Sequence, residues 1–196
     1  ELIITVDDVN EAPSLTNSLA ASSFAENVST GTTIATASAA DPESQTITYS
    51  LSGTGSGNFA VDSAGNITLA AGLDYETATS YSLTLSASDG VNTTTNSLTI
   101  TIDDVNEAPS LSSSLAASSF AENLATGTTI ATASASDPES QSITYSLSGT
   151  GSDKFAVDSA GNITLSSAFD YETTTSYSLT LTASDGTNST SNTINV

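Results

Sequence analysis

The sequence predicts an all-β protein made of two tandem seven-stranded Greek-key β-sandwiches arranged end to end. One observation is an internal repeat: residues 7–100 match residues 103–196 without a gap, and 73 of these 94 positions are identical. A second is the alternation of apolar and polar residues with a period of two, which is typical of strands that bury one face. A third is that helical spacing never persists for more than a turn. About seven short strands in about 96 residues favour a sandwich.

The repeat predicts two domains, because a unit of about 96 residues can bury a core of its own. We place the first domain at residues 1–104 and the second at residues 105–196. Residues 1–6 align with residues 97–102, so residues 1–8 resemble the end of an upstream repeat followed by a connector. The chain stops before a third connector, and we expect both ends to be cuts in a longer array of repeats.

Alternating runs separated by turn residues place the individual strands. In the run 80–88, Tyr81, Leu83 and Leu85 alternate with Ser and Thr. Glycine-rich and Asp-Gly segments, which favour turns, separate such runs. In the first repeat we therefore expect strands near residues 22–24, 32–39, 46–51, 58–61, 66–69, 80–88 and 93–102.

Composition excludes several classes of function. The net charge is −21 and Lys154 is the only basic residue, which argues against nucleic-acid partners, since phosphate binding needs Lys and Arg. The chain has no Cys and no His, so thiol chemistry and nucleophilic triads are excluded and we expect no enzyme. No apolar run approaches the roughly 20 residues that span a bilayer, so membrane insertion is not expected.

Acidic residues are concentrated at the predicted ends of strands and in the connectors. Of the 11 acidic residues in the first half, nine lie there, while outward strand positions hold Ser and Thr. The connector Asp103-Asp104-Val105-Asn106-Glu107-Ala108-Pro109 repeats residues 7–13 letter for letter. The other two acidic residues of the first half are Glu1 and Asp62, and we interpret Asp62 and its counterpart Asp158 as turn residues whose carboxylates bond to the local backbone.

Strand ends gather at the two opposite ends of a sandwich, so these acids should converge where one repeat follows another. At the junction between the two repeats the sequence predicts nine carboxylates and one amide: Glu26, Asp74, Glu76, Asp103, Asp104, Asn106, Glu107, Asp137, Glu139 and Asp185. Like charges this close repel one another unless a counter-ion lies between them. An all-oxygen set selects a hard cation, and a set of variable geometry favours Ca²⁺ over Mg²⁺. The sequence therefore predicts Ca²⁺ as the cofactor.

The motifs resemble those of tandem cadherin-like repeats, particularly the bacterial versions in large calcium-binding surface adhesins. The resemblance rests on five motifs in the right order and a connector, and it covers both repeats nearly end to end. The connector resembles the family form Asp-x-Asn-Asp-Asn-x-Pro. The motifs are Phe24-Ala25-Glu26-Asn27, Asp41-Pro42-Glu43, the hairpin 59–67, Leu73-Asp74-Tyr75-Glu76 and Ala87-Ser88-Asp89-Gly90.

Two departures from the family pattern bear on the site. Tyr75 and Tyr171 stand where the family has Arg, which removes a cation from the site. The connector has one residue fewer than the longer family form, which leaves open whether Asp103 or Asp104 is the ligand. The resemblance implies a second half-site at the upstream connector, made of Asp8, Asn10, Glu11, Asp41, Glu43 and Asp89. It also implies a matching half-site, Glu122, Asp170 and Glu172, after the second repeat.

The resemblance implies a spacer or adhesion function on the outside of a bacterial cell, with neighbouring repeats of the same chain as the main partners. Bound Ca²⁺ would rigidify each junction between repeats. A module that binds polysaccharide or pairs homophilically is the alternative. Against glycan binding, the chain has no Trp, and Tyr49 and Tyr81 occupy apolar strand positions that predict a core role. Tyr75 and Tyr171 are the two tyrosines that we expect to be exposed.

Overall fold

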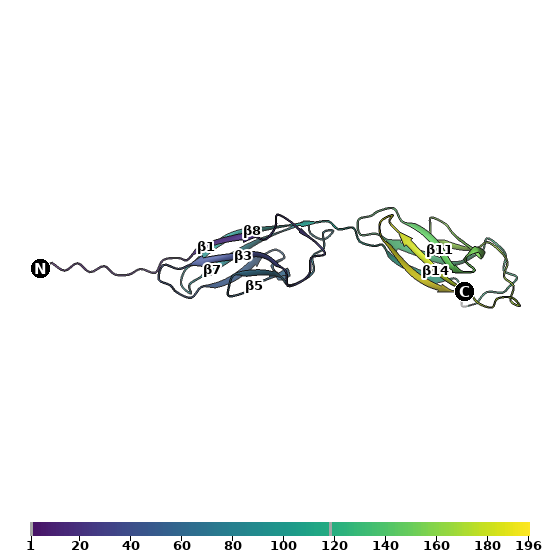
Figure 1. Ribbon diagram of the computed structural model, residues 1–196, viewed down its shortest axis with the longest axis horizontal. Helices are drawn as coiled ribbons and strands as arrows, with labels where there is room; N and C mark the ends of the chain where they lie inside the picture. The colour runs from purple at the N-terminus through teal and green to yellow at the C-terminus, as the bar shows by residue number, and fades with distance from the viewer. Residues whose placement is uncertain (1, 118) are drawn as a thin grey trace. The chain divides into compact units, whose positions relative to one another are not determined.

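The computed structural model describes residues 2–117 and 119–196, and the chain folds into two compact units, Glu1–Val105 and Asn106–Val196 (Figure 1). Each unit is a sandwich of two sheets whose strands are mostly antiparallel, so the predicted all-β, Greek-key class is confirmed. The described residues contain only two short 3-10 turns, η1 (Ser56–Asn58) and η2 (Ser152–Lys154). None of these residues belongs to a helix long and apolar enough to span a membrane.

The first unit has eight strands in two four-stranded sheets. One sheet has the order β1-β3-β6-β5 and the other the order β2-β8-β7-β4. All neighbouring strands are antiparallel except β2 and β8, which run parallel. The strands are β1 (Ser14–Leu19), β2 (Phe24–Ala25), β3 (Thr33–Ala40), β4 (Thr48–Gly53), β5 (Phe59–Val61), β6 (Asn66–Leu69), β7 (Ser80–Ser88) and β8 (Thr93–Asp103).

The second unit repeats this plan with a four-stranded sheet, β12-β13-β10-β9, and a three-stranded sheet, β11-β14-β15. Its described residues contain no counterpart of β2. The strands are β9 (Ser110–Leu115), β10 (Thr129–Ser136), β11 (Thr144–Thr150), β12 (Phe155–Val157), β13 (Asn162–Leu165), β14 (Ser178–Ser184) and β15 (Ser189–Asn195).

One strand of each unit is missing from the prediction. We expected the first strand near residues 22–24, but β1 already begins at Ser14 and pairs with β3. Only Leu15 of β1 is buried, because β1 is an edge strand and presents most of its polar side chains to water. Asn96 of the other sheet donates its Nδ2 to the carbonyl of Leu15 at 2.8 Å, which helps to hold this weakly apolar strand in place.

The alternation seen in the sequence corresponds to burial. Leu83, Leu85 and Ile100 are each at most 2% exposed, while their Ser and Thr neighbours face outward. Phe59 packs edge-on against Tyr81, with ring centroids 5.4 Å apart. Burial of these apolar side chains stabilises each unit, and the strand ends are left free to carry the acidic residues.

The turn interpretation of Asp62 is correct. Its Oδ1 accepts hydrogen bonds from the backbone amides of Ala64 (2.9 Å) and Asn66 (2.8 Å), and its Oδ2 accepts one from the Asn66 side chain (2.8 Å). Gly65 closes the turn with a φ of 84°, a left-handed conformation that favours glycine. The hydrogen bonds from Asn66 hold the pKa of Asp62 below its ordinary value, and Asp158 in the second unit has the same partners and the same direction.

Candidate metal centre

Each unit carries two groups of acidic side chains, one where the chain arrives from the preceding connector and one where it leaves. We call these the upstream end and the downstream end of a unit. In the first unit, Asp41 follows β3 and Asp89 follows β7, and both lie at the upstream end. Asp74 follows β6 and belongs to the downstream end, together with Glu26 after β2.

At the upstream end of the first unit, the connector is bound by the loops that carry the acids. Asn10 donates its Nδ2 to Asp89 Oδ2 at 2.9 Å, and the backbone amide of Glu11 donates to Glu43 Oε2 at 3.3 Å. Asp41 Oδ1 accepts the backbone amide of Glu43 at 3.0 Å. These contacts bring five of the six sequence-predicted residues of this half-site together, while Asp8 is exposed in the segment before them.

The upstream end of the second unit repeats these contacts. Asn106 donates its Nδ2 to Asp185 Oδ2 at 2.8 Å, and the amide of Glu107 donates to Glu139 Oε1 at 3.2 Å. Asp137 Oδ1 accepts the backbone amide of a neighbouring loop residue, Gln141, at 2.9 Å. The same constellation therefore forms twice from the same local sequence.

Several carboxylate oxygens at the upstream ends are buried without a hydrogen-bond donor among the described residues. They are Asp41 Oδ2 in the first unit and Asp137 Oδ2 and Glu139 Oε2 in the second. A buried anionic oxygen without a partner is costly, because it has lost water and gained nothing in return. These oxygens fit a bound cation, which would supply the missing partner.

Two pairs of glutamates share hydrogen bonds at the same ends. A side-chain hydrogen bond with Glu11, together with burial, raises the pKa of Glu43, whereas the corresponding bond with Glu107 lowers the pKa of Glu139. Two carboxylates this close to each other repel when both are ionised. Each pair is therefore short of positive charge when no cation is bound.

At the downstream end of the first unit, Glu26 is the organising residue and is only 6% exposed. Its Oε2 accepts the backbone amide of Tyr75 at 2.7 Å and its Oε1 accepts that of Val105 at 2.8 Å. Its own amide donates to the carbonyl of Asp103 at 3.1 Å. One carboxylate thus joins the loop after β6 to the connector.

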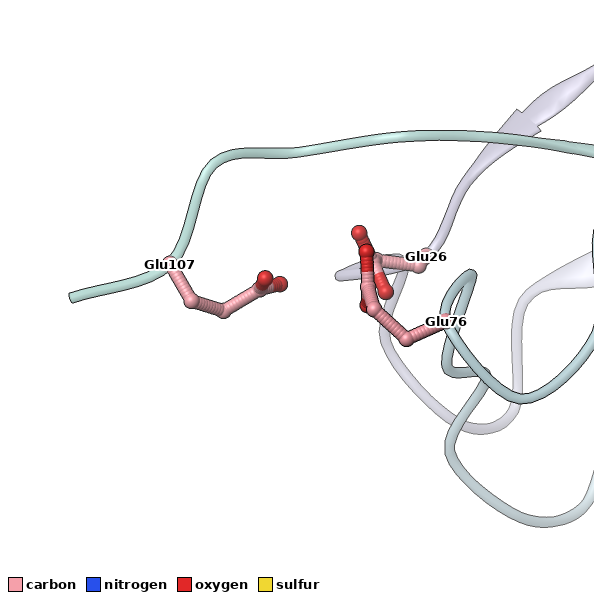
Figure 2. Close-up of side chains that lie close together, drawn as sticks. All are labelled: Glu26, Glu76 and Glu107. Carbon is pink, nitrogen blue, oxygen red and sulfur yellow. The ribbon is translucent and has the colours of Figure 1, made fainter. Parts of the chain in front are cut away.

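The other acids of this end lie around Glu26. A carboxylate oxygen of Glu76 lies within 4.8 Å of one from Glu26, and an oxygen of Glu76 lies within the same distance of one from Asp104. Figure 2 shows the Glu26 and Glu76 side chains, which come from separate loops and direct their carboxylates to one place. Asp103 Oδ2 instead accepts the hydroxyl of Ser23 at 2.5 Å.

Asp74 has a local role in the structure. Its Oδ1 accepts the Thr77 amide and its Oδ2 accepts the Thr77 hydroxyl, both at 2.9 Å, so both oxygens cap the turn after β6. Each carboxylate oxygen has two lone-pair sites, so a cation could still share them. Asp170 makes the equivalent bonds to Thr173 in the second unit.

The downstream end of the second unit has the same acids in a more open setting. Glu122 Oε2 accepts the amide of Tyr171 at 3.0 Å, as Glu26 does with Tyr75. Glu122, Asp170 and Glu172 are all exposed. Tyr171 is 64% exposed as expected, whereas Tyr75 is half-buried against the core, so the prediction for Tyr75 was wrong.

Sequence reasoning missed the amide side chains that hold the connector asparagines. Gln45 and Gln141 donate their side-chain amides to the Oδ1 atoms of Asn10 and Asn106. Asn188 donates its Nδ2 to the carbonyl of Asn106 at 2.7 Å. One signal was present in the sequence, because Asp185 begins an Asp-Gly turn, and its carboxylate accepts the backbone amide of Asn188 in that turn.

The acidic groups at the upstream and downstream ends have the ligand chemistry that a hard cation needs. Every side chain that is offered is a carboxylate or an amide, which is the ligand set of Ca²⁺. No Lys or Arg neutralises them, because Lys154 is the only basic residue and its Nζ donates to the carbonyl of Ala168. The donor set and the buried oxygens without donors both fit Ca²⁺.

The chain is similar to known proteins over most of its length. A family model described as "Cadherin domain" matches residues 21–103 and 117–196. The chain is 36% identical over 205 residues to "Protocadherin-like wing polarity protein stan" of Drosophila melanogaster, a match that covers 95% of this chain and 6% of that protein. It is 34% identical over 194 residues to "Protocadherin Fat 4" of Mus musculus, covering 92% and 4%. The chain therefore spans only a small part of these relatives.

Solved structures show the same fold. "PcdhgB3 EC1-4 in 50 mM HEPES" matches with a TM-score of 0.63 and 26% identity, covering 95% of this chain and 49% of that one. "Crystal structure of Drosophila N-cadherin EC1-4" matches with a TM-score of 0.55 and 28% identity, covering 89% and 46%.

Proposed function

The chain consists of two tandem domains of the cadherin family, and from that premise we propose that they are extracellular adhesion repeats whose junction is rigidified by bound Ca²⁺. The observation that carries this proposal is the set of buried carboxylate oxygens that lack a hydrogen-bond donor among the described residues, Asp41 Oδ2, Asp137 Oδ2 and Glu139 Oε2. Hydrogen-bonded loops hold these oxygens in position, and a bound cation would supply the partner that they lack.

The proposed ligands at the junction between the two units form two sets. The first unit ends at Val105 and the second begins at Asn106. The first set belongs to the downstream end of the first unit and comprises Glu26, Asp74, Glu76, Asp103 and Asp104. The second belongs to the upstream end of the second unit and comprises Asn106, Glu107, Asp137, Glu139 and Asp185. We propose that Asp8, Asn10, Glu11, Asp41, Glu43 and Asp89 form the corresponding half-site of the upstream connector.

Between Asp103 and Asp104, the contacts favour Asp104 as the bridging ligand. Asp104 lies within 4.8 Å of Glu76, whereas one oxygen of Asp103 already accepts the Ser23 hydroxyl. Asp103 would then contribute mainly through its carbonyl, which receives the Glu26 amide, and through its charge. This assignment makes Asp104 the residue to test.

The mechanism is a linkage between cation binding and alignment of the domains. When bound, Ca²⁺ supplies positive charge and oxygen coordination to carboxylates that would otherwise repel one another. Each set has five residues, several of whose oxygens already accept hydrogen bonds from the loops, so we propose that a shell of six to eight ligands draws on both sets. Binding therefore favours the state in which both sets face the same ion, and it stabilises that state by mass action.

We propose a cell-surface location for the parent protein, with neighbouring repeats of its own chain as partners. The resemblance to bacterial surface adhesins suggests a spacer that holds a distal binding domain away from the cell. The mechanism is the same for a homophilic adhesion role, and catalysis has no part in it, because the chain has neither His nor Cys.

Small-angle scattering of the chain with 2 mM Ca²⁺ and with chelator tests this proposal. With Ca²⁺ we expect the maximum dimension of the chain to be larger and the range of conformations in solution to be narrower, because the junction stops flexing. An Asp104→Ala variant should give the chelator result under both conditions. A scattering profile of the original chain that is the same with and without Ca²⁺ would reject the proposal.

A further inference from the structure

The side chain of Asn106 in the connector has a hydrogen-bond partner for each of its polar atoms within the second unit. Its Nδ2 donates to Asp185 Oδ2 at 2.8 Å and to the carbonyl of Glu107 at 3.0 Å, and its Oδ1 accepts the side-chain amide of Gln141. An amide side chain has two N–H donors and one carbonyl oxygen, so both atoms are engaged. These bonds attach the side chain to the second unit through protein groups alone.

The backbone of the connector is held in the same unit. Asn188 lies between β14 and β15 and donates its Nδ2 to the carbonyl of Asn106 at 2.7 Å. Asn106 and Asn188 are both half-buried, so water competes less for this bond than it does at the surface. Further along the connector, Pro109 is less than 2% exposed. The connector is therefore joined to the second unit at several points between residues 106 and 109.

The loop that carries Gln141 contains a residue in an uncommon backbone conformation. Ser140 has a φ of 61°, in the left-handed region that residues other than glycine seldom adopt. It lies between Gln141 and Glu139, whose Oε1 accepts the amide of Glu107 at 3.2 Å. A conformation of this kind persists where the surrounding structure determines it. Here both neighbours of Ser140 contact the connector.

The first unit makes the same contacts around Asn10. Gln45 donates its side-chain amide to Asn10 Oδ1, and Asn92 donates its Nδ2 to the carbonyl of Asn10 at 3.1 Å. Asn10 Nδ2 donates to Asp89 Oδ2 at 2.9 Å. Ser44, next to Gln45, has a φ of 59°. The arrangement around the connector asparagine is therefore a feature of both units and not of one loop alone.

We propose that Gln141 and Asn188 are positioning residues that hold Asn106 on the second unit in the absence of metal. In this role Asn106 fixes the connector, so that the carboxylates on either side of it are presented to a cation, and it is not a direct ligand of that cation. A cation at Asn106 Oδ1 would compete with the Gln141 amide for the same oxygen. The role at the cation site rests on the proposed function, whereas the attachment of the connector does not.

Amide hydrogen exchange of the whole chain in chelator, measured by NMR, tests the attachment of the connector. The reporter is the Glu107 amide, which we expect to exchange at least about tenfold more slowly than in an unstructured peptide, because it is bonded to Glu139. Gln141→Met removes the donor to Asn106 at similar side-chain length. It should speed this exchange by about fivefold, the change that one hydrogen bond of ordinary net strength gives. Gln141 is exposed, so the variant should keep the circular dichroism of the original chain.

Gln45→Met is the matched control, because Gln45 makes the equivalent bond in the first unit. It should speed the exchange of the Glu11 amide and leave that of Glu107 unchanged, and Gln141→Met should do the reverse. A Glu107 amide that exchanges at the unstructured rate in the original chain would overturn the proposal. Equal effects of the two substitutions on the Glu107 amide would also overturn it.

Asn106→Asp tests whether Asn106 acts as a positioning residue or as a direct ligand. A direct ligand that gains a negative charge should bind Ca²⁺ more tightly, since affinity depends on the charge of the ligands. A positioning residue instead loses its Nδ2 bonds and gains a repulsive contact with Asp185, so the tightest Ca²⁺ binding should weaken by about fivefold or more. Calcium titration calorimetry measures this change, and tighter binding by the variant would overturn the positioning role.

The same titration on Gln141→Met separates this inference from the proposed function. This substitution changes no charge and removes no proposed ligand, yet it should weaken Ca²⁺ binding. Unchanged Ca²⁺ affinity together with faster exchange of the Glu107 amide would reject the positioning role. If the original chain binds no Ca²⁺ but the exchange results in chelator are as expected, the attachment of the connector is supported and the proposed function is rejected.

Discussion

The downstream ends of the two units have nearly the same sequence but differ in what covers them. In the first unit, Glu26 is 6% exposed and accepts amides from both Tyr75 and Val105. In the second unit, Glu122 keeps the bond to Tyr171 but is exposed. Glu26 is buried where the connector that follows β8 donates the Val105 amide to it.

In the first unit, the acidic end is completed by the connector that follows it. A glutamate that is an ordinary surface carboxylate in one unit becomes a buried link between a loop and the connector in the other. Burial raises the cost of removing such a carboxylate, because its amide donors would be left without an acceptor.

The largest expected effect comes from removing the buried glutamate. Glu26→Ala leaves the amides of Tyr75 and Val105 without acceptors, so it should lower the free energy of unfolding of the first unit by about 1–3 kcal/mol. Glu122→Ala should cost below about 0.5 kcal/mol, as most exposed substitutions do. Urea unfolding in chelator, followed by circular dichroism, measures both, and equal losses would contradict the comparison.

Calcium should have the next largest effect on stability. Ligand that binds only the folded state adds about 2.7 kcal/mol when present at 100 times its dissociation constant. We expect Ca²⁺ to raise the melting temperature of the chain, and chelator to reverse the change. Mg²⁺ at the same concentration should give a smaller increase, since it demands stricter octahedral geometry.

Substituting a residue whose buried oxygen has no donor should change the stability of its unit, in a direction that depends on whether Ca²⁺ is present. Asp137→Asn removes a negative charge from a crowded site, so it should stabilise the second unit in chelator by up to about 1 kcal/mol. With Ca²⁺ present it should destabilise the unit, because a charged ligand has been lost. Melting under both conditions measures this, and a change of the same sign in both would exclude a cation site at Asp137.

The smallest expected effect on stability comes from the turns at Asp62 and Asp158, which are the same in the two units. The pKa values of Asp62 and Asp158 are lowered in the folded state. Their contribution to the free energy of unfolding is therefore present above the ordinary aspartate pKa and is lost as pH falls through the lowered value. Asp62→Asn and Asp158→Asn should each reduce the loss of stability in acid by the same small amount. Acid unfolding in chelator measures this, and a clear difference between the variants would show that the turns are not equivalent.

Much of the fold could be predicted from the sequence because period-two alternation reports burial directly. The run 80–88 became β7 and residues 66–69 became β6 with the expected bounds. β1 was missed because an edge strand with one buried leucine does not alternate clearly. Its pairing with β3 depends on contacts distant in sequence, which a local pattern does not contain.

The candidate site could be predicted as a set of residue types but not as a network. Strand-end placement identified the acids, yet it could not show that Asp74 caps its own turn or that Glu26 joins two segments. It also gave no reason to prefer Asp104 over Asp103, a distinction that depends on the Ser23 hydroxyl. Hydrogen-bond partners of this kind are fixed by the packing of loops and not by sequence spacing.

Calcium titration calorimetry on the chain and on two aligned variants tests the central claim most directly. Asp104 and Asp8 occupy the same place in the two connectors, and a carboxylate oxygen of Asp104 lies within 4.8 Å of one from Glu76 at the downstream end of the first unit. We predict that Asp104→Ala weakens the tightest Ca²⁺ binding by at least about tenfold and that Asp8→Ala leaves it unchanged. Equal effects of the two substitutions, or no measurable Ca²⁺ binding by the original chain, would contradict a cation site built around the connector at residues 103–109.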